Sequence, residues 1–143
     1  MPVTAEVRVR YAETDQMNVV YYANYYVWFE IGRVEVLRSL GLSYRQLEKD
    51  HNLGLPVIES HCRYRSPARY DDEIVVETRP SMLRGSVIKF EYKILRKPHG
   101  GGPERELLAE GHTVHVVCDD KFQRQHFPQH VAEGIRAMMV EGS

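Results

Sequence analysis

The chain has 143 residues, of which 43% are hydrophobic and 27% are charged, and its formal net charge is -1. This length suits one domain with a sizeable core, so we expect residues 1–143 to form a single domain. A charge this close to zero gives no broad basic surface of the kind that binds nucleic acid or an anionic membrane. We therefore expect neither partner, and a phosphorylated ligand would need a local cluster of basic residues.

The cysteine and histidine patterns favour a cytoplasmic protein without a metal centre. The two cysteines, Cys62 and Cys118, have no metal-ligand spacing and are too few for a disulfide framework. His112 and His115 are three residues apart on a predicted strand, so they should face opposite ways. The N-terminus lacks the apolar core of a secretion signal, and the most hydrophobic stretch, 19–31, is too short to span a bilayer. We expect no metal ion and no organic cofactor.

The first third of the chain predicts a strand, a loop and a long helix. Apolar and polar residues alternate over 3–10, which is typical of a half-buried strand. Short polar side chains over 11–20 indicate a loop. The longest helical segment covers about 22–40, and Gly41 is placed to end it. Apolar side chains occupy nearly every side of this helix, so we expect it to be largely enclosed.

The remainder is mostly strand. A short helix is predicted over 43–50, with Ser43 as its N-cap, and a final helix over 128–140. Strands are predicted over four further segments: 55–64, 73–82, 88–94 and 106–118. This order indicates an α+β fold in which one antiparallel sheet of about five strands curls around the long helix. Such a sheet has free edges, so we expect the protein to associate through an edge.

Asp15 is the first candidate for chemistry. It lies a few residues before the predicted helix, in a run with several aromatic residues. The first N–H groups of that helix, near Tyr22 and Ala23, have no partner inside the helix, and the helix dipole favours negative charge there. A carboxylate near such an amide is a minimal site for acyl transfer. Glu13 is a rival carboxylate two residues away, and these arguments alone do not choose between the two.

Two segments carry a family resemblance. The first is Tyr-Ala-Glu-Thr-Asp-Gln-Met-Asn-Val-Val-Tyr-Tyr-Ala-Asn-Tyr over 11–25, and the second is Tyr-Arg-Ser-Pro-Ala-Arg-Tyr-Asp-Asp over 64–72. Both resemble the 4-hydroxybenzoyl-CoA thioesterase family of hot-dog proteins, including its YbgC-like acyl-CoA thioesterase branch. The resemblance implies a hot-dog fold and a homodimer with a continuous sheet across its interface. It further implies that dimers often pair into tetramers and that the active sites lie at the dimer interface.

The resemblance also implies roles for single residues. Asp15 matches the catalytic Asp, which acts as nucleophile or as general base on water. Tyr22 matches the position whose backbone N–H receives the thioester carbonyl, although many YbgC-like proteins have His there. Asn18 stands where both branches commonly have Gly, and Asn tolerates left-handed backbone better than most residues. We assign Asn18 and Ala23, beside the helix start, to substrate binding.

A predicted turn offers a site for the CoA phosphates. Arg84 and Ser86 flank Gly85 between two predicted strands, where a phosphate could be reached, so we assign both to substrate binding. The sequence thus predicts hydrolysis of a small or medium acyl-CoA or aryl-CoA thioester to free acid and CoA. Two alternatives stay open: a non-catalytic acyl-CoA binding protein and a hot-dog enoyl-CoA hydratase. The sequence does not indicate which acyl or aryl group is preferred, or whether CoA or acyl carrier protein carries it.

Overall fold

The computed structural model describes residues 2–141. Among these, no helix is both long and apolar enough to cross a membrane. Strands, helices and one short 3-10 turn follow in the order β1 (Val3–Arg8), η1 (Tyr11–Glu13), α1 (Asn24–Ser39), α2 (Tyr44–His51), β2 (Val57–Tyr64), β3 (Glu73–Arg84), β4 (Val87–Arg96), β5 (Glu106–Val116) and α3 (Gln129–Glu141).

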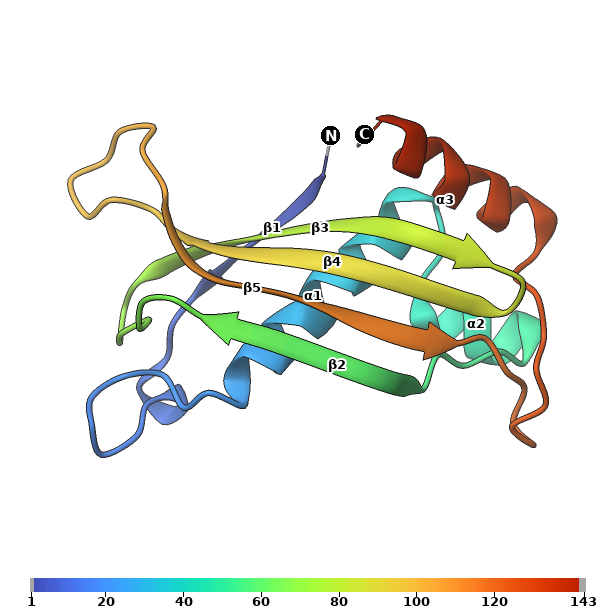
Figure 1. Ribbon diagram of the computed structural model, residues 1–143, viewed down its shortest axis with the longest axis horizontal. Coiled ribbons are helices and arrows are strands. Elements are labelled where there is room, and N and C mark those ends of the chain that lie inside the picture. The colour runs from blue at the N-terminus through green and yellow to red at the C-terminus, as the bar shows by residue number, and fades with distance from the viewer. Residues whose placement is uncertain (1, 142–143) are drawn as a thin grey trace.

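The described strands form one antiparallel sheet in the order β1-β3-β4-β5-β2. The long helix α1 runs along one face of this sheet, and α3 packs against β3 at the far end (Figure 1). The predicted α+β architecture, five strands curved around a long helix, is confirmed. The helix begins at Asn24, two residues later than predicted, because Tyr22 and Ala23 form a turn before it.

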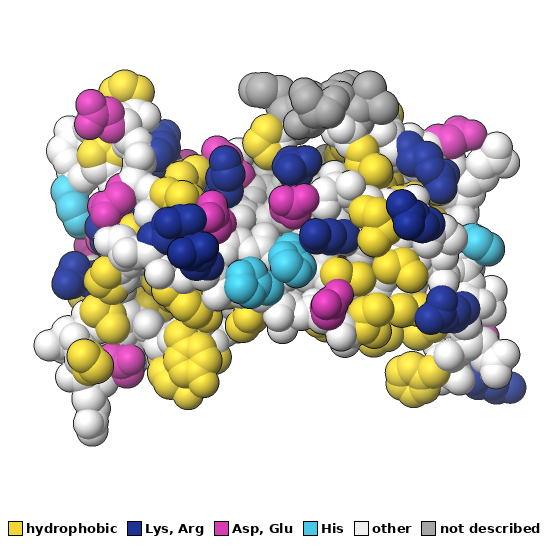
Figure 2. Space-filling model, viewed as in Figure 1, with side chains coloured by type: hydrophobic (Ala, Val, Ile, Leu, Met, Phe, Trp, Pro, Cys, Tyr) yellow, Lys and Arg dark blue, Asp and Glu magenta, His cyan; other side chains and the backbone are white. Residues whose placement is uncertain are grey.

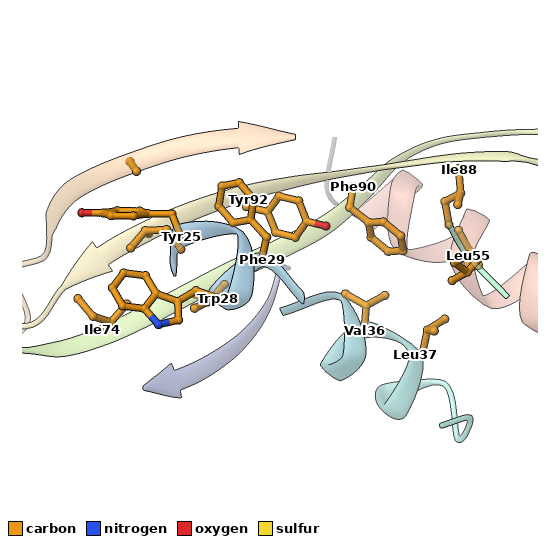
Figure 3. Packing of buried hydrophobic residues seen from close by; sticks show 14 of the residues in the cluster. Tyr25, Trp28, Phe29, Val36, Leu37, Leu55, Ile74, Ile88, Phe90 and Tyr92 are labelled. Atoms are coloured by element: carbon orange, nitrogen blue, oxygen red, sulfur yellow. The ribbon is translucent and has the colours of Figure 1, made fainter. Parts of the chain in front are cut away.

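The core lies between α1 and the sheet (Figure 3). Trp28 and Phe29 of α1 are fully buried, and the Phe29 ring stacks on Tyr92 of β4 with a centroid distance of 4.2 Å. The helix approaches the sheet closely at Gly32, where a Cβ atom would lie 2.0 Å from Thr78 Oγ1. Glycine at this position therefore lets α1 lie directly against β3.

The predicted helix signals after α1 are confirmed. Gly41 has a φ of 78°, and its N–H donates to the Arg38 carbonyl at 2.9 Å, so it ends α1 in the left-handed conformation that glycine tolerates. Ser43 caps α2, because its hydroxyl accepts the Gln46 N–H at 3.1 Å. The Gln46 side chain accepts the Ser43 N–H in return, which completes a capping box.

The prediction that α1 is enclosed on nearly every side is wrong for the single chain. The sheet covers one side of the helix only, and Val27, on the opposite side, is 46% exposed. Val34 on that same side is half-buried. Hydrophobic side chains on a helix tend to be covered, so this side of α1 is available for contact with another molecule.

The sheet face that points away from α1 is polar (Figure 2). Side chains opposite one another on four strands alternate in charge across this face, in the order Glu77, Lys93, Glu110 and Arg63. Opposite charges on neighbouring strands attract, so the face compensates its own charge. A depression of about 680 Å³ on this face contains these four side chains and does not include Asp15.

A chain of hydrogen bonds runs through the core near the end of the sheet that lies beside α2. His115 Nδ1 lies 2.9 Å from the Leu55 carbonyl oxygen, which can only accept, so Nδ1 carries the proton. Burial lowers the pKa of His115 to about 4, so the ring is neutral at pH 7 and its Nε2 accepts the Thr113 hydroxyl proton at 2.8 Å. Thr113 must then accept from the Tyr92 hydroxyl at 2.6 Å.

The burial of His115 predicts how stability depends on pH. The unfolded chain takes up a proton on this ring near pH 6.5, whereas the folded chain resists until about pH 4. The part of the free energy of unfolding that depends on a neutral His115 is therefore fully present above pH 6.5 and is lost as the pH falls toward 4. We expect the stability advantage of the unaltered chain over His115→Gln to shrink by about 3 kcal/mol over this interval. Urea unfolding of both proteins at several pH values tests this, and a stability difference that does not change with pH would contradict it.

Candidate functional site

A buried carboxylate holds the loop before α1 in place. Glu13 is only 5% exposed, and its two oxygens accept the Arg10 N–H at 2.8 Å and the Trp28 Nε1–H at 3.3 Å. Its backbone carbonyl accepts the Tyr21 N–H and the Asn24 side-chain amide, both at 2.9 Å. Glu13 thus joins the loop to the first turns of the helix and has a structural task of its own.

Asp15 begins a tight turn on the outer side of this loop. Its carbonyl accepts the Asn18 N–H at 3.0 Å, and Oδ1 accepts the Met17 N–H at 2.8 Å. Asn18 has a φ of 62°, the left-handed conformation that the sequence indicated Asn would tolerate. Within residues 2–141, Asp15 Oδ2 makes no hydrogen bond, and the residue is half-buried. One carboxylate oxygen is therefore free for chemistry.

Two backbone amides are free where α1 begins. The Asn24 N–H donates to the Tyr21 carbonyl at 2.9 Å, and the Tyr25 N–H donates to the Tyr22 carbonyl at 3.2 Å. In the described part of the chain, the N–H groups of Tyr22 and Ala23 donate to no protein acceptor. These two donors lie at the positive end of the helix dipole, which is a general arrangement for binding an anion.

The Asp15 turn and the free amides lie at the same end of the molecule. An antiparallel bridge between Thr14 and Val20 closes the loop, with Asp15 opposite Val19 on its inner side and Tyr21 opposite Glu13 on its outer side. A hydrogen bond with the Tyr22 hydroxyl is the largest cause of a raised pKa at Tyr21, and the Asp15 charge adds to it. Asp15 and the Asn18 turn therefore lie on the loop that leads into the free amides of Tyr22 and Ala23, near enough to Tyr21 for the Asp15 charge to act on it.

Arg84 and Ser86 lie elsewhere in the single chain. They flank the hairpin between β3 and β4, at the end of the sheet opposite the loop that contains Asp15 (Figure 1). Arg84 is exposed, whereas Ser86 is 8% exposed and its carbonyl accepts the Val117 N–H at 2.7 Å. One chain alone therefore does not bring these two residues to Asp15.

The two histidines of β5 and the two cysteines were further candidates for chemistry. His112 points to the polar face of the sheet, where its ring stacks on His61, and His115 points into the core, so the predicted opposite orientation is confirmed. Cys118 is buried, and Cys62 is half-buried, with burial raising the pKa of its thiol. A raised pKa disfavours the thiolate that nucleophilic attack would need.

Comparisons with known proteins identify the family of the chain. The model of the family described as "Thioesterase-like superfamily" matches residues 9–135 of this chain. The chain belongs to this superfamily. The putative acyl-CoA thioesterase YneP of Bacillus subtilis is 38% identical over 114 residues, which cover 80% of this chain and 78% of that protein. The acyl-CoA thioesterase YbgC of Haemophilus influenzae is 35% identical over 127 residues, covering 87% and 88%.

A solved structure shows the same fold at lower identity. The 4-hydroxybenzoyl-CoA thioesterase of Pseudomonas sp. strain CBS-3 superposes with a TM-score of 0.83 at 21% identity, covering 92% of this chain and 97% of that one. The expected hot-dog fold of the thioesterase-like superfamily is thereby confirmed.

Two residues of this superfamily member were not singled out as functional by their sequence pattern. Asn24 joins the helix start to the Glu13 carbonyl, and the Tyr64 hydroxyl donates to the Tyr22 carbonyl at 3.1 Å. Tyr64 is 42 residues from Tyr22 in sequence and comes from β2, so only the folded chain brings the two together. The sequence signal for Tyr64 was its position as the first residue of the segment 64–72, which resembles the family.

The two neighbouring carboxylates should respond differently to substitution. Glu13→Gln leaves a donor amide facing either Arg10 N–H or Trp28 Nε1–H, so we expect the free energy of unfolding to fall by about 1–3 kcal/mol. Trp28 is the single tryptophan of the chain, and its fluorescence during urea unfolding provides the measurement. Asp15→Asn keeps the acceptor for the Met17 N–H and serves as the control with nearly unchanged stability. Equal stability of the two variants would contradict the structural role of Glu13.

Proposed function

We propose that the protein hydrolyses small or medium acyl-CoA or aryl-CoA thioesters to the free acid and CoA. The observation that carries the proposal is a carboxylate with one free oxygen at Asp15, on the loop that leads into two free amides at the start of α1. Relatives at 38% and 35% identity are named as acyl-CoA thioesterases, the first of them putative, which supports the same reaction class. Tyr22 and Ala23 would contribute backbone N–H groups, and their side chains are secondary.

The chemistry requires few groups. The thioester carbonyl oxygen would accept hydrogen bonds from the Tyr22 and Ala23 amides, which stabilise the negative charge that develops on it. As general base, Asp15 takes a proton from water, the hydroxide adds to the carbonyl carbon, and the C–S bond breaks to release CoA thiolate. As nucleophile, Asp15 adds to the carbonyl carbon, the C–S bond breaks to release CoA thiolate, and water then hydrolyses the mixed anhydride that has formed. Both routes end in the same products and need the same geometry.

Aromatic side chains surround the proposed reaction centre. The Tyr22 ring is 59% exposed and lies between Tyr21, at a centroid distance of 4.8 Å, and Tyr64, at 6.3 Å. Such rings present flat apolar surface to an acyl or aryl group. This surface supports a thioester with an apolar acyl part over a highly charged one.

We further propose a homodimer through β2. This strand pairs with β5 on one side only, and seven of its eight residues are exposed. A long exposed edge strand pairs readily with a second copy. A two-fold axis normal to the sheet reverses strand direction, so the β3–β4 hairpin of the partner would lie at the same end of the joined sheet as Asp15. This arrangement is how Arg84 and Ser86 would approach bound CoA, and two such dimers could pair into a tetramer.

The reaction is tested by release of free thiol from a panel of aromatic, short and long acyl-CoAs. We expect turnover by the unaltered protein, and a loss of about 10²- to 10⁴-fold in kcat for Asp15→Asn, the usual contribution of one acid–base group. Asp120→Asn, the same change at an exposed site in a different loop, is the control and should retain full activity. Tight binding without thiol release would favour an acyl-CoA binding protein. Hydration of an enoyl-CoA without hydrolysis would favour a hydratase.

The proposed interface is tested by a charge on the free edge. Ile58 of β2 is 55% exposed, and we expect Ile58→Lys to convert the oligomer into smaller species in analytical ultracentrifugation, with loss of activity. Thr4→Lys, on the exposed opposite edge β1, is the matched control and should keep the mass unchanged. A monomeric parent protein, or an unchanged mass for Ile58→Lys, would rule out pairing through β2.

A further inference from the structure

We propose that Tyr64 is a positioning residue whose hydroxyl orients and polarises the peptide unit between Tyr22 and Ala23. That unit carries the Tyr22 carbonyl at one end and the Ala23 N–H at the other. The inference rests on the proposed function, in which the Ala23 N–H receives the thioester carbonyl. The Tyr64 hydroxyl itself would touch neither substrate nor the attacking water and would act through the backbone.

The geometry brings Tyr64 to the carbonyl from the opposite side of the site. Its hydroxyl donates to the Tyr22 carbonyl oxygen at 3.1 Å, and this bond joins the end of β2 to the turn before α1. The Tyr25 N–H donates to the same oxygen at 3.2 Å. Because the carbonyl has two lone pairs, both donors can be accommodated, and together they fix the direction of the peptide plane.

The Tyr64 ring is held by two neighbours. It makes an edge-on contact with Tyr25 at a centroid distance of 5.0 Å and a second one with Tyr22 at 6.3 Å, both with interplanar angles of 88°. Tyr25 is itself anchored, because its ring is 2% exposed and its hydroxyl accepts the Ala68 N–H at 3.1 Å. Tyr64 is 42% exposed, and its contact with the anchored Tyr25 ring holds it where its hydroxyl reaches the Tyr22 carbonyl.

Peptide geometry connects this bond to the free amide. The peptide unit is planar and trans, so the Tyr22 carbonyl and the Ala23 N–H point in opposite directions along one rigid group. A donor on the carbonyl oxygen draws electron density from the unit and makes the N–H at its other end a stronger donor, as hydrogen bonds in a chain polarise one another. The Ala23 N–H is thereby oriented and polarised in advance to donate to the thioester oxygen that becomes negative during attack.

The hydroxyl stays in its donor form. Burial, followed by the neighbouring Cys62 thiol, raises the pKa of Tyr64 above its ordinary value. The proton needed for the bond to Tyr22 is accordingly present across the pH range in which thioester hydrolysis would be assayed.

The test is the kinetic effect of Tyr64→Phe, which keeps the ring and removes only the hydroxyl. We expect kcat to fall about tenfold with KM within a factor of two. This loss is smaller than the 10²–10³ typical for a direct oxyanion donor, because the amide itself remains. Tyr70→Phe is the matched control, since Tyr70 is 58% exposed and its hydroxyl makes no hydrogen bond within residues 2–141. The control should match the unaltered protein.

A spectroscopic readout separates polarisation from packing. A carbon-13-labelled aromatic acyl-CoA is bound to Asp15→Asn and to the double variant with Tyr64→Phe, and the infrared stretch of the thioester carbonyl is compared. We expect a shift to lower frequency on binding to Asp15→Asn and a smaller shift in the double variant. Equal shifts, an unchanged kcat, or an effect on KM alone would overturn the role of Tyr64. Absence of any thiol release by the unaltered protein would instead overturn the proposed function.

Discussion

The buried carboxylate of Glu13 is the constraint on which the site depends. It accepts hydrogen bonds from the backbone before the loop and from Trp28 inside the core, while its carbonyl holds Tyr21 and Asn24. A buried carboxylate without donors would be strongly unfavourable, so the loop can adopt this path only when the helix presents Trp28 correctly. The position of Asp15 relative to the helix start is therefore a consequence of core packing.

The start of α1 is formed so that its donors remain free. Ordinarily a side chain caps the first amides of a helix, as Ser43 does for α2. At α1 the N-cap position is Ala23, which has no side-chain acceptor, and the turn before it uses only carbonyl groups. These free amides are the donors on which the proposed hydrolysis depends.

The single chain leaves two surfaces without cover at the places where a second copy would lie. The edge of β2 is exposed along nearly its whole length, and the far side of α1 presents Val27 to solvent. The outer face of the sheet is different, because its alternating charges compensate one another and are stable in water. Because the outer face is stable in water whereas the β2 edge is unpaired, the structure supports association through the edge, with the outer face in solvent.

The sequence by itself determined the architecture, because the alternation in strands and the caps at Gly41 and Ser43 are local signals that reflect local backbone chemistry. It also indicated Asp15 and the amides of Tyr22 and Ala23, which lie within a few residues of one another. Local chemistry alone could not choose between Glu13 and Asp15, and the family motif favoured Asp15; the structural task of Glu13 depends on Trp28 and the core. Only the tertiary structure decided that Tyr64 meets Tyr22 and that Arg84 lies at the opposite end of the sheet. Both facts depend on the pairing of distant strands, and a local pattern carries no information about which distant residue will lie across from it.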